Sequence, residues 1–278
     1  MKNIACEFGE NQRLKGVLSW PTDERRDKMA LILISAGFTA KMGPHRVYAE
    51  LARSLAALGV ATLRFDLGGI GNSQTLHPGQ ALEVRTKHDI QNAIAFLQEQ
   101  HGIEKFVIGG LCSGAEDAFH YAAGDARVTG VLMIDPHAYK TRMWSIRNVA
   151  SRRFLNRLIH KVLRVIGIIK VVRDENAVSD VEGLESSLIN YCYTSHYEST
   201  RILKELITRD VHLHYVYTGG RAAVFNHKRQ FLNMFKGVEF GRNLTLDYIP
   251  NIEHTQVFEE DRQELVTVIS QRLSAIHS

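Results

Sequence analysis

The sequence has few cysteines, and they form no recognisable pattern. Cys6, Cys112 and Cys192 are the only three in 278 residues, and they lie far apart, with no Cys-x-x-Cys pair and no Cys/His ligand spacing. A disulfide framework or a structural zinc site needs such pairs. We therefore expect free thiols in a reducing compartment, and we expect neither a metal nor a cofactor.

Long apolar runs are also lacking. The amino-terminal residues soon become polar, and no stretch reaches the roughly 18 uncharged apolar residues that a membrane span requires. We predict a soluble, cytoplasmic protein. Its hydrophobic content of 45% is enough for a large core, and one α/β domain with an insertion is the expected organisation.

Acidic residues are absent from one long stretch. Between Pro136 and Arg173 there are ten lysines and arginines and no aspartate or glutamate, whereas the rest of the chain has 24 basic and 30 acidic residues. On a helical wheel, Arg153, Arg157 and Arg164 lie on one side and apolar residues on the other. The pattern predicts an amphipathic basic helix.

Two interpretations of this helix stay open. It could pack its apolar face over a site, or it could dock an anionic partner such as an acyl carrier protein, a coenzyme A thioester or an anionic membrane surface. No aromatic platform accompanies the charge, so nucleic acid is not expected.

Elsewhere, short apolar strands alternate with amphipathic helices, which indicates a mostly parallel sheet covered on both faces. The expected strands are Asn3–Phe8, Leu14–Trp20, Met29–Ser35, Val60–Asp66, Lys105–Ile108, Val128–Ile134, Val211–Gly219 and Asn243–Ile249. The expected helices are His45–Leu58, Lys87–Gln100, one ending at Ala123, His227–Phe235 and Glu259–Ile276, and Val47, Leu51, Leu55 and Leu58 are expected on one face of the first. The alternation stops at Pro136 and resumes near Val211, so we predict a core of residues 1–136 and 201–278 and a basic helical cap of residues 137–200.

The segment GLCSGA follows an expected strand and precedes an expected helix. A nucleophile on such a strained turn needs small residues two positions before and two positions after it. Cys112 meets this requirement with Gly110 and Gly114, whereas Ser113 would have Leu111 in the first position. Cys112 is therefore the expected nucleophile, and a helix amino terminus favours its thiolate. A small buried cysteine is the plainer interpretation of the same residue.

Histidine is the expected base, and His254 in NIEHTQVF lies between the last strand and the last helix. His212 and His214 alternate on a strand and are expected to be neighbours on one face, and His137 could line the cap. The backbone amides of Ser113 and of Phe38, which follows Gly37 in the loop after the third strand, are the expected oxyanion donors.

In chain order, SAGFTAKMGPHRVYAELARSLAALGVATLRFDLGGIGNS, GLCSGA and EHT resemble the α/β-hydrolase superfamily, and more narrowly its serine aminopeptidase-like and exosortase-associated hydrolases. The resemblance implies an α/β-hydrolase fold with a mostly parallel eight-stranded sheet, flanking helices and a helical cap. Members of this superfamily have serine or, as in dienelactone hydrolases, cysteine at the position of Cys112. The family acid usually follows the seventh strand, where this chain has Arg221, Ala222 and Ala223 instead.

A second family position for the acid is the end of the sixth strand, where Asp135 stands. We predict that Asp135 orients His254, although an aspartate before proline could also cap the strand end. Asp66 is a weaker alternative, whereas Glu253 is expected to point the wrong way on a tight loop, and a Cys/His pair without an acid could still act.

These features predict a hydrolase or acyltransferase that acts on an ester or thioester, small or carrier-linked, through Cys112, His254 and Asp135 and a covalent acyl-enzyme. The alternative is a catalytically degenerate hydrolase that binds a hydrophobic or anionic ligand, which the missing acid after the seventh strand would explain.

Overall fold

A single eight-stranded sheet organises the computed structural model, which describes residues 1–22, 28–37, 39–150 and 194–275. The strand order is β1-β2-β4-β3-β5-β6-β7-β8. β1 and β2 form an antiparallel hairpin, β2 pairs antiparallel with β4, and all later pairs are parallel. The strands are β1 (Lys2–Phe8), β2 (Leu14–Trp20), β3 (Met29–Ile34), β4 (Ala61–Phe65), β5 (Lys105–Leu111), β6 (Val128–Ile134), β7 (His212–Thr218) and β8 (Leu244–Ile249).

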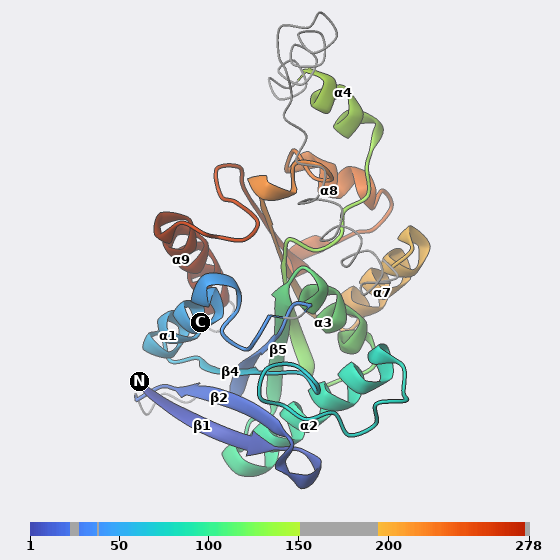
Figure 1. Cartoon of the computed structure of the whole chain (residues 1–278). Coiled ribbons are helices and arrows are strands. Elements are labelled where there is room, and N and C mark those ends of the chain that lie inside the picture. The colour runs from blue at the N-terminus through green and yellow to red at the C-terminus, as the bar shows by residue number, and fades with distance from the viewer. Residues whose placement is uncertain (23–27, 38, 151–193, 276–278) are drawn as a thin grey trace, which may run out of the picture.

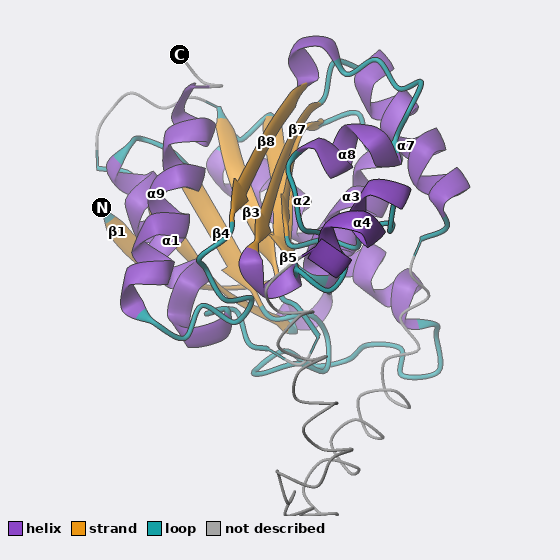
Figure 2. Cartoon of the chain, turned by 90° about the horizontal axis from the view of Figure 1, so that it is seen from above, coloured by secondary structure: helices purple, strands orange, loops and turns teal. Residues whose placement is uncertain are grey.

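Helices cover both faces of this sheet (Figure 2). One face carries α1 (Val47–Ala57) and α9 (Glu259–Ala275), and the other carries α2 (Leu82–His101), α3 (Ser113–Ala123), α7 (His196–Thr208) and α8 (Arg229–Met234). Figure 1 shows β5 running directly into α3 near the middle of the molecule. Because the central strands are parallel, their carboxyl ends meet along one edge of the sheet, and residues that follow them come together there.

The central strand β3 shows why the sheet is buried on both faces. All six of its residues are buried, and they alternate between the two cores: Ala30, Ile32 and Ile34 pack toward α2 and α3, whereas Leu31 and Leu33 pack toward α1 and α9. An uninterrupted apolar strand of this kind is typical of a parallel sheet.

All of the predicted strands and helices within the described residues are present, with shifts at their ends. α2 begins at Leu82, five residues before the predicted start. The prediction missed its first turn because Leu82 and Val84 are exposed there and give no amphipathic signal. β5 continues to Leu111, since the two glycines after Ile108 keep the strand pairing. Leu58 was expected on the buried face of α1, but that helix ends at Ala57 and Leu58 is 51% exposed.

Most of the predicted cap, including the basic helix around Arg153, Arg157 and Arg164, lies outside the described residues. Its first part contains α4 (Arg142–Ala150). The predicted end of the cap at residue 200 falls inside α7, and Ile202, Leu203 and Leu206 of that helix belong to the main core.

Candidate active site

Cys112 occupies the turn between β5 and α3. Its backbone has φ 52° and ψ −115°, a strained conformation for a residue with a side chain. A Cβ atom on Gly110 would lie 2.7 Å from the Ile34 carbonyl oxygen, and one on Gly114 would lie 2.4 Å from the same oxygen. The turn therefore requires glycine on both sides of Cys112, and Cys112, not Ser113, has the positive φ.

Asp135 follows β6 at the same edge of the sheet, also with a positive φ of 47°. Its side chain is fully buried. Its carboxylate accepts hydrogen bonds from the Thr218 amide and hydroxyl, each 2.6 Å long, and Thr218 is the last residue of β7. These contacts hold the carboxylate in one orientation and leave it facing the loop after β8.

That loop carries His254, whose Nδ1 lies 2.8 Å from Asp135 Oδ2. The ring also hydrogen-bonds to Cys112. Cys112, His254 and Asp135, predicted from three separate parts of the sequence, are thus brought together in one chain of contacts. With Nδ1 turned toward Asp135, Nε2 is the ring nitrogen left for the thiol.

Two glycines after β7 allow the His254 loop to approach. A Cβ atom on Gly219 would lie 1.8 Å from the Pro250 carbonyl oxygen, and one on Gly220 would lie 2.1 Å from the His254 amide nitrogen. The Gly220 amide also donates to the Ile252 carbonyl at 3.0 Å. This role of the two glycines was not predicted, because the segment after β7 was considered only for the acid that it lacks. The Gly219-Gly220 pair is the sequence signal that could have indicated a close approach of another segment.

The electrostatics of the site favour a thiolate and an imidazolium. Burial of the thiol would raise the pKa of Cys112, but the hydrogen bond to His254 and the positive charges of Arg221 and His254 outweigh burial and hold the pKa below its ordinary value. Burial would lower the pKa of His254, but Asp135 and Cys112 raise it to about 9. By contrast, burial raises the pKa of Cys6 to about 11.

Of the two predicted oxyanion donors, the structure places one. The Ser113 backbone amide interacts with the Cys112 thiol, and the Ser113 hydroxyl accepts a hydrogen bond from the Gly37 amide at 2.8 Å. Phe38 lies outside the described residues. The loop after β3 is therefore tied to the first residue of α3, close to Cys112.

The weaker candidates for the acid have other contacts. Asp66 is buried and accepts bonds from the amide and ammonium of Lys41, each 2.6 Å long, and from the Asn72 amide, so it organises the loops after β3 and β4. Glu253 is exposed. Among the three carboxylates considered, the hydrogen bond to His254 is made by Asp135.

Three further residues of this region were not predicted as site residues: Glu116, Arg221 and His137, although His137 was expected to line the cap. Glu116 in α3 is buried, and its carboxylate accepts a bond from the His137 amide at 2.8 Å. His137 is half-buried after β6. Arg221, which stands where an acid was sought, acts by its charge on Cys112, Glu116 and His137. A charged residue in a loop gives no sequence signal of which neighbours it will face.

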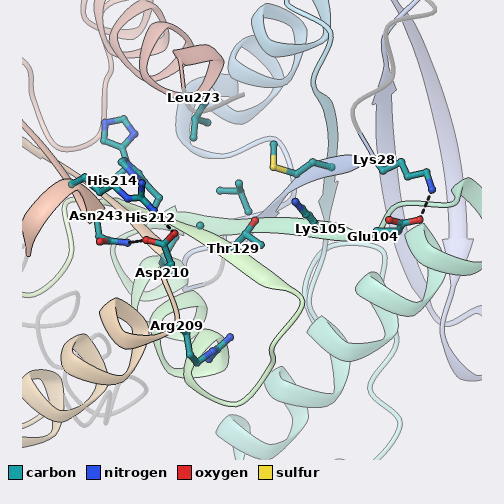
Figure 3. Close-up of a pocket in the computed structure, with 15 residues that line it drawn as sticks. Lys28, Glu104, Lys105, Thr129, Arg209, Asp210, His212, His214, Asn243 and Leu273 are labelled. Atoms are coloured by element: carbon teal, nitrogen blue, oxygen red, sulfur yellow. Dashed lines mark hydrogen bonds and ion pairs between the residues drawn. The ribbon is translucent and has the colours of Figure 1, made fainter. Parts of the chain in front are cut away.

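The amino ends of the strands form a different feature. A cavity of about 880 Å³ lies there (Figure 3), and its lining includes Met29, Lys105, Gly130, His212 and Asn243, which lie at or near the first residues of β3, β5, β6, β7 and β8. None of its lining residues belongs to the Cys112 site. His212 and His214, expected on one face of β7, both hydrogen-bond to β8, at Thr245 and Asp247.

In residues 1–22, 28–37, 39–150 and 194–275, no group of three histidine, cysteine or acidic side chains is arranged to hold a metal ion. No helix in the same ranges combines the length and hydropathy of a membrane span.

Comparison with known proteins agrees with this architecture. Residues 30–156 match the sequence model of the alpha/beta hydrolase fold family. No curated protein matches the sequence.

Similar solved structures include an esterase from Pyrococcus furiosus, with a TM-score of 0.62, 12% identity and coverage of 99% of this chain and 91% of that one. A lidless α/β serine hydrolase from Xanthomonas campestris has a TM-score of 0.57, 13% identity and coverage of 98% and 93%. Proline iminopeptidase from Mycobacterium smegmatis has a TM-score of 0.59, 13% identity and coverage of 100% of both chains. The chain therefore has the α/β-hydrolase fold, as predicted.

Proposed function

Since the chain has the α/β-hydrolase fold, we propose that it is a hydrolase or acyltransferase that uses Cys112 as its nucleophile on an ester or thioester. One observation carries this proposal: Cys112 sits at a strained strand-to-helix turn, in contact with a histidine whose other ring nitrogen is bound by a buried carboxylate. Nucleophile, base and orienting acid in this order form a catalytic triad.

The first half of the proposed reaction forms the acyl-enzyme. The Cys112 thiolate attacks the carbonyl carbon, a C–S bond forms, and the carbonyl π electrons move onto the oxygen. The Ser113 amide donates to that oxyanion, and the Phe38 amide is the proposed second donor. When the intermediate collapses, the bond to the leaving oxygen or sulfur breaks, and His254 donates the Nε2 proton to the leaving group.

The second half releases the acyl group. His254, now neutral, removes a proton from water or from another acceptor, which attacks the thioester carbon. The C–S bond then breaks, and Cys112 leaves as a thiolate beside the re-formed imidazolium. Asp135 accepts a hydrogen bond from Nδ1 throughout, so the ring keeps Nε2 toward the reacting groups.

Acyl thioesters are the substrates we favour within this class. A thiol nucleophile exchanges one thioester for another, so acyl transfer and hydrolysis are both open to it. The basic stretch between Pro136 and Arg173 supports an anionic carrier such as coenzyme A or an acyl carrier protein. An anionic membrane surface, a cytoplasmic location and kinship with the serine aminopeptidase-like and exosortase-associated hydrolases are further proposals, and they rest on the sequence alone.

The test is turnover of a panel of esters and acyl-coenzyme A thioesters by the wild type, Cys112→Ala and Cys112→Ser. Cys6→Ala is the matched control, because Cys6 is a second free cysteine and lies in the core. We expect Cys6→Ala to keep its activity and Cys112→Ala to lose at least about 100-fold, the scale of a lost nucleophile. Unchanged activity in Cys112→Ala would remove the centre of the proposal. Binding of panel members without turnover in the wild type would favour a catalytically degenerate binding protein.

A further inference from the structure

Arg221 lies close to the proposed nucleophile, and the triad does not use it. It ends the short 3₁₀ helix Gly219–Arg221, which follows β7 directly. Its neighbour Gly220 packs against the His254 backbone, and the Arg221 carbonyl accepts hydrogen bonds from Val224 and Phe225 at 2.9 and 2.8 Å. The backbone of Arg221 is therefore held firmly at the carboxyl edge of the sheet, beside the loop that carries His254.

The guanidinium of Arg221 has no anionic partner among the described residues. None of the ion pairs within residues 1–22, 28–37, 39–150 and 194–275 includes it. Its Nε is buried and has no hydrogen-bond partner in the same ranges. A buried, unsatisfied donor on a charged group costs free energy unless a ligand satisfies it.

Glu116, a buried carboxylate on which the charge of Arg221 acts, forms no ion pair with it. Both Glu116 oxygens are in use, one accepting from the His137 amide at 2.8 Å and the other from the Thr194 hydroxyl at 3.3 Å. Burial also raises the pKa of Glu116, and the positive charge of Arg221 acts on Cys112 as well.

We propose that Arg221 is a specificity residue that binds an oxyanion group of the substrate, a carboxylate or a phosphate, next to the carbon that Cys112 attacks. The inference rests on the proposed function and narrows its substrate class to acyl compounds that carry a negative charge near the scissile bond. Arginine suits this role because its guanidinium makes paired hydrogen bonds to carboxylate and phosphate oxygens.

A second effect of Arg221 has to be separated from this one. Its charge also favours the Cys112 thiolate, so a substitution that removes the charge would slow every reaction of the thiol. Such a loss is the same for neutral and anionic reagents that need the thiolate. The ratio of the rate with an anionic reagent to the rate with a neutral reagent is therefore unaffected by the thiolate effect, and it reports binding of the anion.

The first experiment compares the alkylation of Cys112 by iodoacetate and by iodoacetamide, which differ in a carboxylate and an amide. The rates are followed by intact mass in the wild type, Arg221→Gln and Arg221→Lys. Arg242→Gln is the control, since Arg242 is 84% exposed and lies at the opposite edge of the sheet. We expect the iodoacetate-to-iodoacetamide rate ratio to fall about 10-fold or more in Arg221→Gln, less in Arg221→Lys, and not at all in Arg242→Gln.

This experiment needs no turnover, so it tests Arg221 even where the proposed catalytic function fails. A rate ratio that is the same in the wild type and Arg221→Gln overturns the inference, whether both rates fall together or neither changes. Arg221→Lys serves as the second variant where Arg221→Gln does not fold.

The second experiment identifies which part of the substrate carries the anion. On the acyl side, 4-nitrophenyl hydrogen adipate is compared with 4-nitrophenyl heptanoate. On the leaving-group side, S-hexanoyl thioglycolate, whose carboxylate lies close to the sulfur, is compared with S-hexanoyl thioglycolamide, which is neutral. The inference predicts that kcat/KM for the charged member of one pair falls about 10- to 100-fold more in Arg221→Gln than for its neutral partner. Equal losses in both pairs contradict it.

Discussion

The electrostatics of Cys112 and His254 favour the same charged form of the pair. Despite burial, His254 and Arg221 hold the pKa of Cys112 below its ordinary value, and Asp135 and Cys112 raise the pKa of His254 to about 9. Both shifts favour a thiolate beside an imidazolium, the form in which a cysteine is nucleophilic.

The first prediction at this scale concerns the pH dependence of Cys112 alkylation by iodoacetamide. In the wild type the midpoint should lie below the ordinary thiol pKa, because His254 and Arg221 favour the thiolate despite burial. In His254→Ala the midpoint should rise toward the ordinary thiol pKa of about 8.5, because the hydrogen bond and positive charge that favour the thiolate are gone. Exposed His77→Ala should leave the midpoint unchanged. An equal shift in both variants, or in neither, would mean that His254 is not the partner of the thiol.

The second prediction concerns the titration of His254 by nuclear magnetic resonance. Its pKa should be about 9 in the wild type and should fall in Asp135→Asn, which removes the negative charge beside Nδ1. Because the folded-state pKa exceeds the ordinary value of about 6.5, the imidazolium contributes stability fully below that pH and the contribution is lost as pH rises through about 9. Asp66→Asn is the control, since Asp66 binds Lys41 instead. A His254 pKa unaffected by Asp135→Asn would contradict the assignment of the acid.

At the scale of elements, the site depends on glycines that let backbone segments approach one another. The carboxyl ends of β5 and β7 each lead into a turn where a Cβ atom would meet backbone atoms of a neighbouring segment. These close approaches bring the ends of β5, β6 and β7 and the loop after β8 within reach of one another. Three side chains from separate elements can then touch.

A third prediction follows for Gly220→Ala. The added Cβ would lie 2.1 Å from the His254 amide nitrogen, so the loop after β8 has to move away and carry the imidazole with it. We expect turnover to fall at least about 10-fold, because a displacement of about 1 Å in a catalytic group costs much of its effect. Gly79→Ala, which adds a methyl group with nothing within 4 Å, should keep its activity. Equal activities in the two variants would show that the Gly-Gly pair does not position His254.

The site residues that could be predicted from the sequence are those with a local sequence pattern. The strand-turn-helix pattern around GLCSGA is local, and the sequence placed Cys112 at the turn because only that position has glycine on both sides. Asp135 was proposed as the acid from the resemblance, because members of that superfamily also have an acid at the end of the sixth strand. The meaning of Gly219 and Gly220 was not predicted, because their role appears only when the loop after β8 folds back over them.

At the scale of the whole molecule, a buried ion pair joins three segments that are distant in sequence. Arg13, which precedes β2, pairs with Asp89 in α2, and both side chains are about 95% buried or more. Asp89 also accepts from the Gly68 amide at 2.7 Å, and Arg13 donates to the Gln74 carbonyl at 3.2 Å. The pair therefore connects the amino-terminal hairpin and α2 to the loop after β4.

A fourth prediction tests this connection by urea unfolding. Asp89→Ala should lower the free energy of unfolding by about 3–5 kcal/mol, because it leaves the Arg13 charge buried without its partner. Glu104→Ala removes an exposed ion pair with Lys28 and should cost about 1 kcal/mol or less. Similar losses in the two variants would contradict the connecting role of Asp89.

The overall architecture was predictable because it repeats one physical pattern, a buried strand followed by an amphipathic helix, through most of the chain. The surroundings of Cys112 were less predictable. Arg221 and Glu116 come from different elements and affect each other only through the fold, so neither residue type nor spacing identified them.

The most direct test of the central claim is the intact mass of the protein within seconds of mixing with an activated ester or an acyl-coenzyme A thioester. The account predicts a mass increase of one acyl group in the wild type, located on the Cys112 peptide, and none in Cys112→Ala. An increase that persists in Cys112→Ala, or turnover in that variant at the wild-type rate, would show that Cys112 is not the nucleophile.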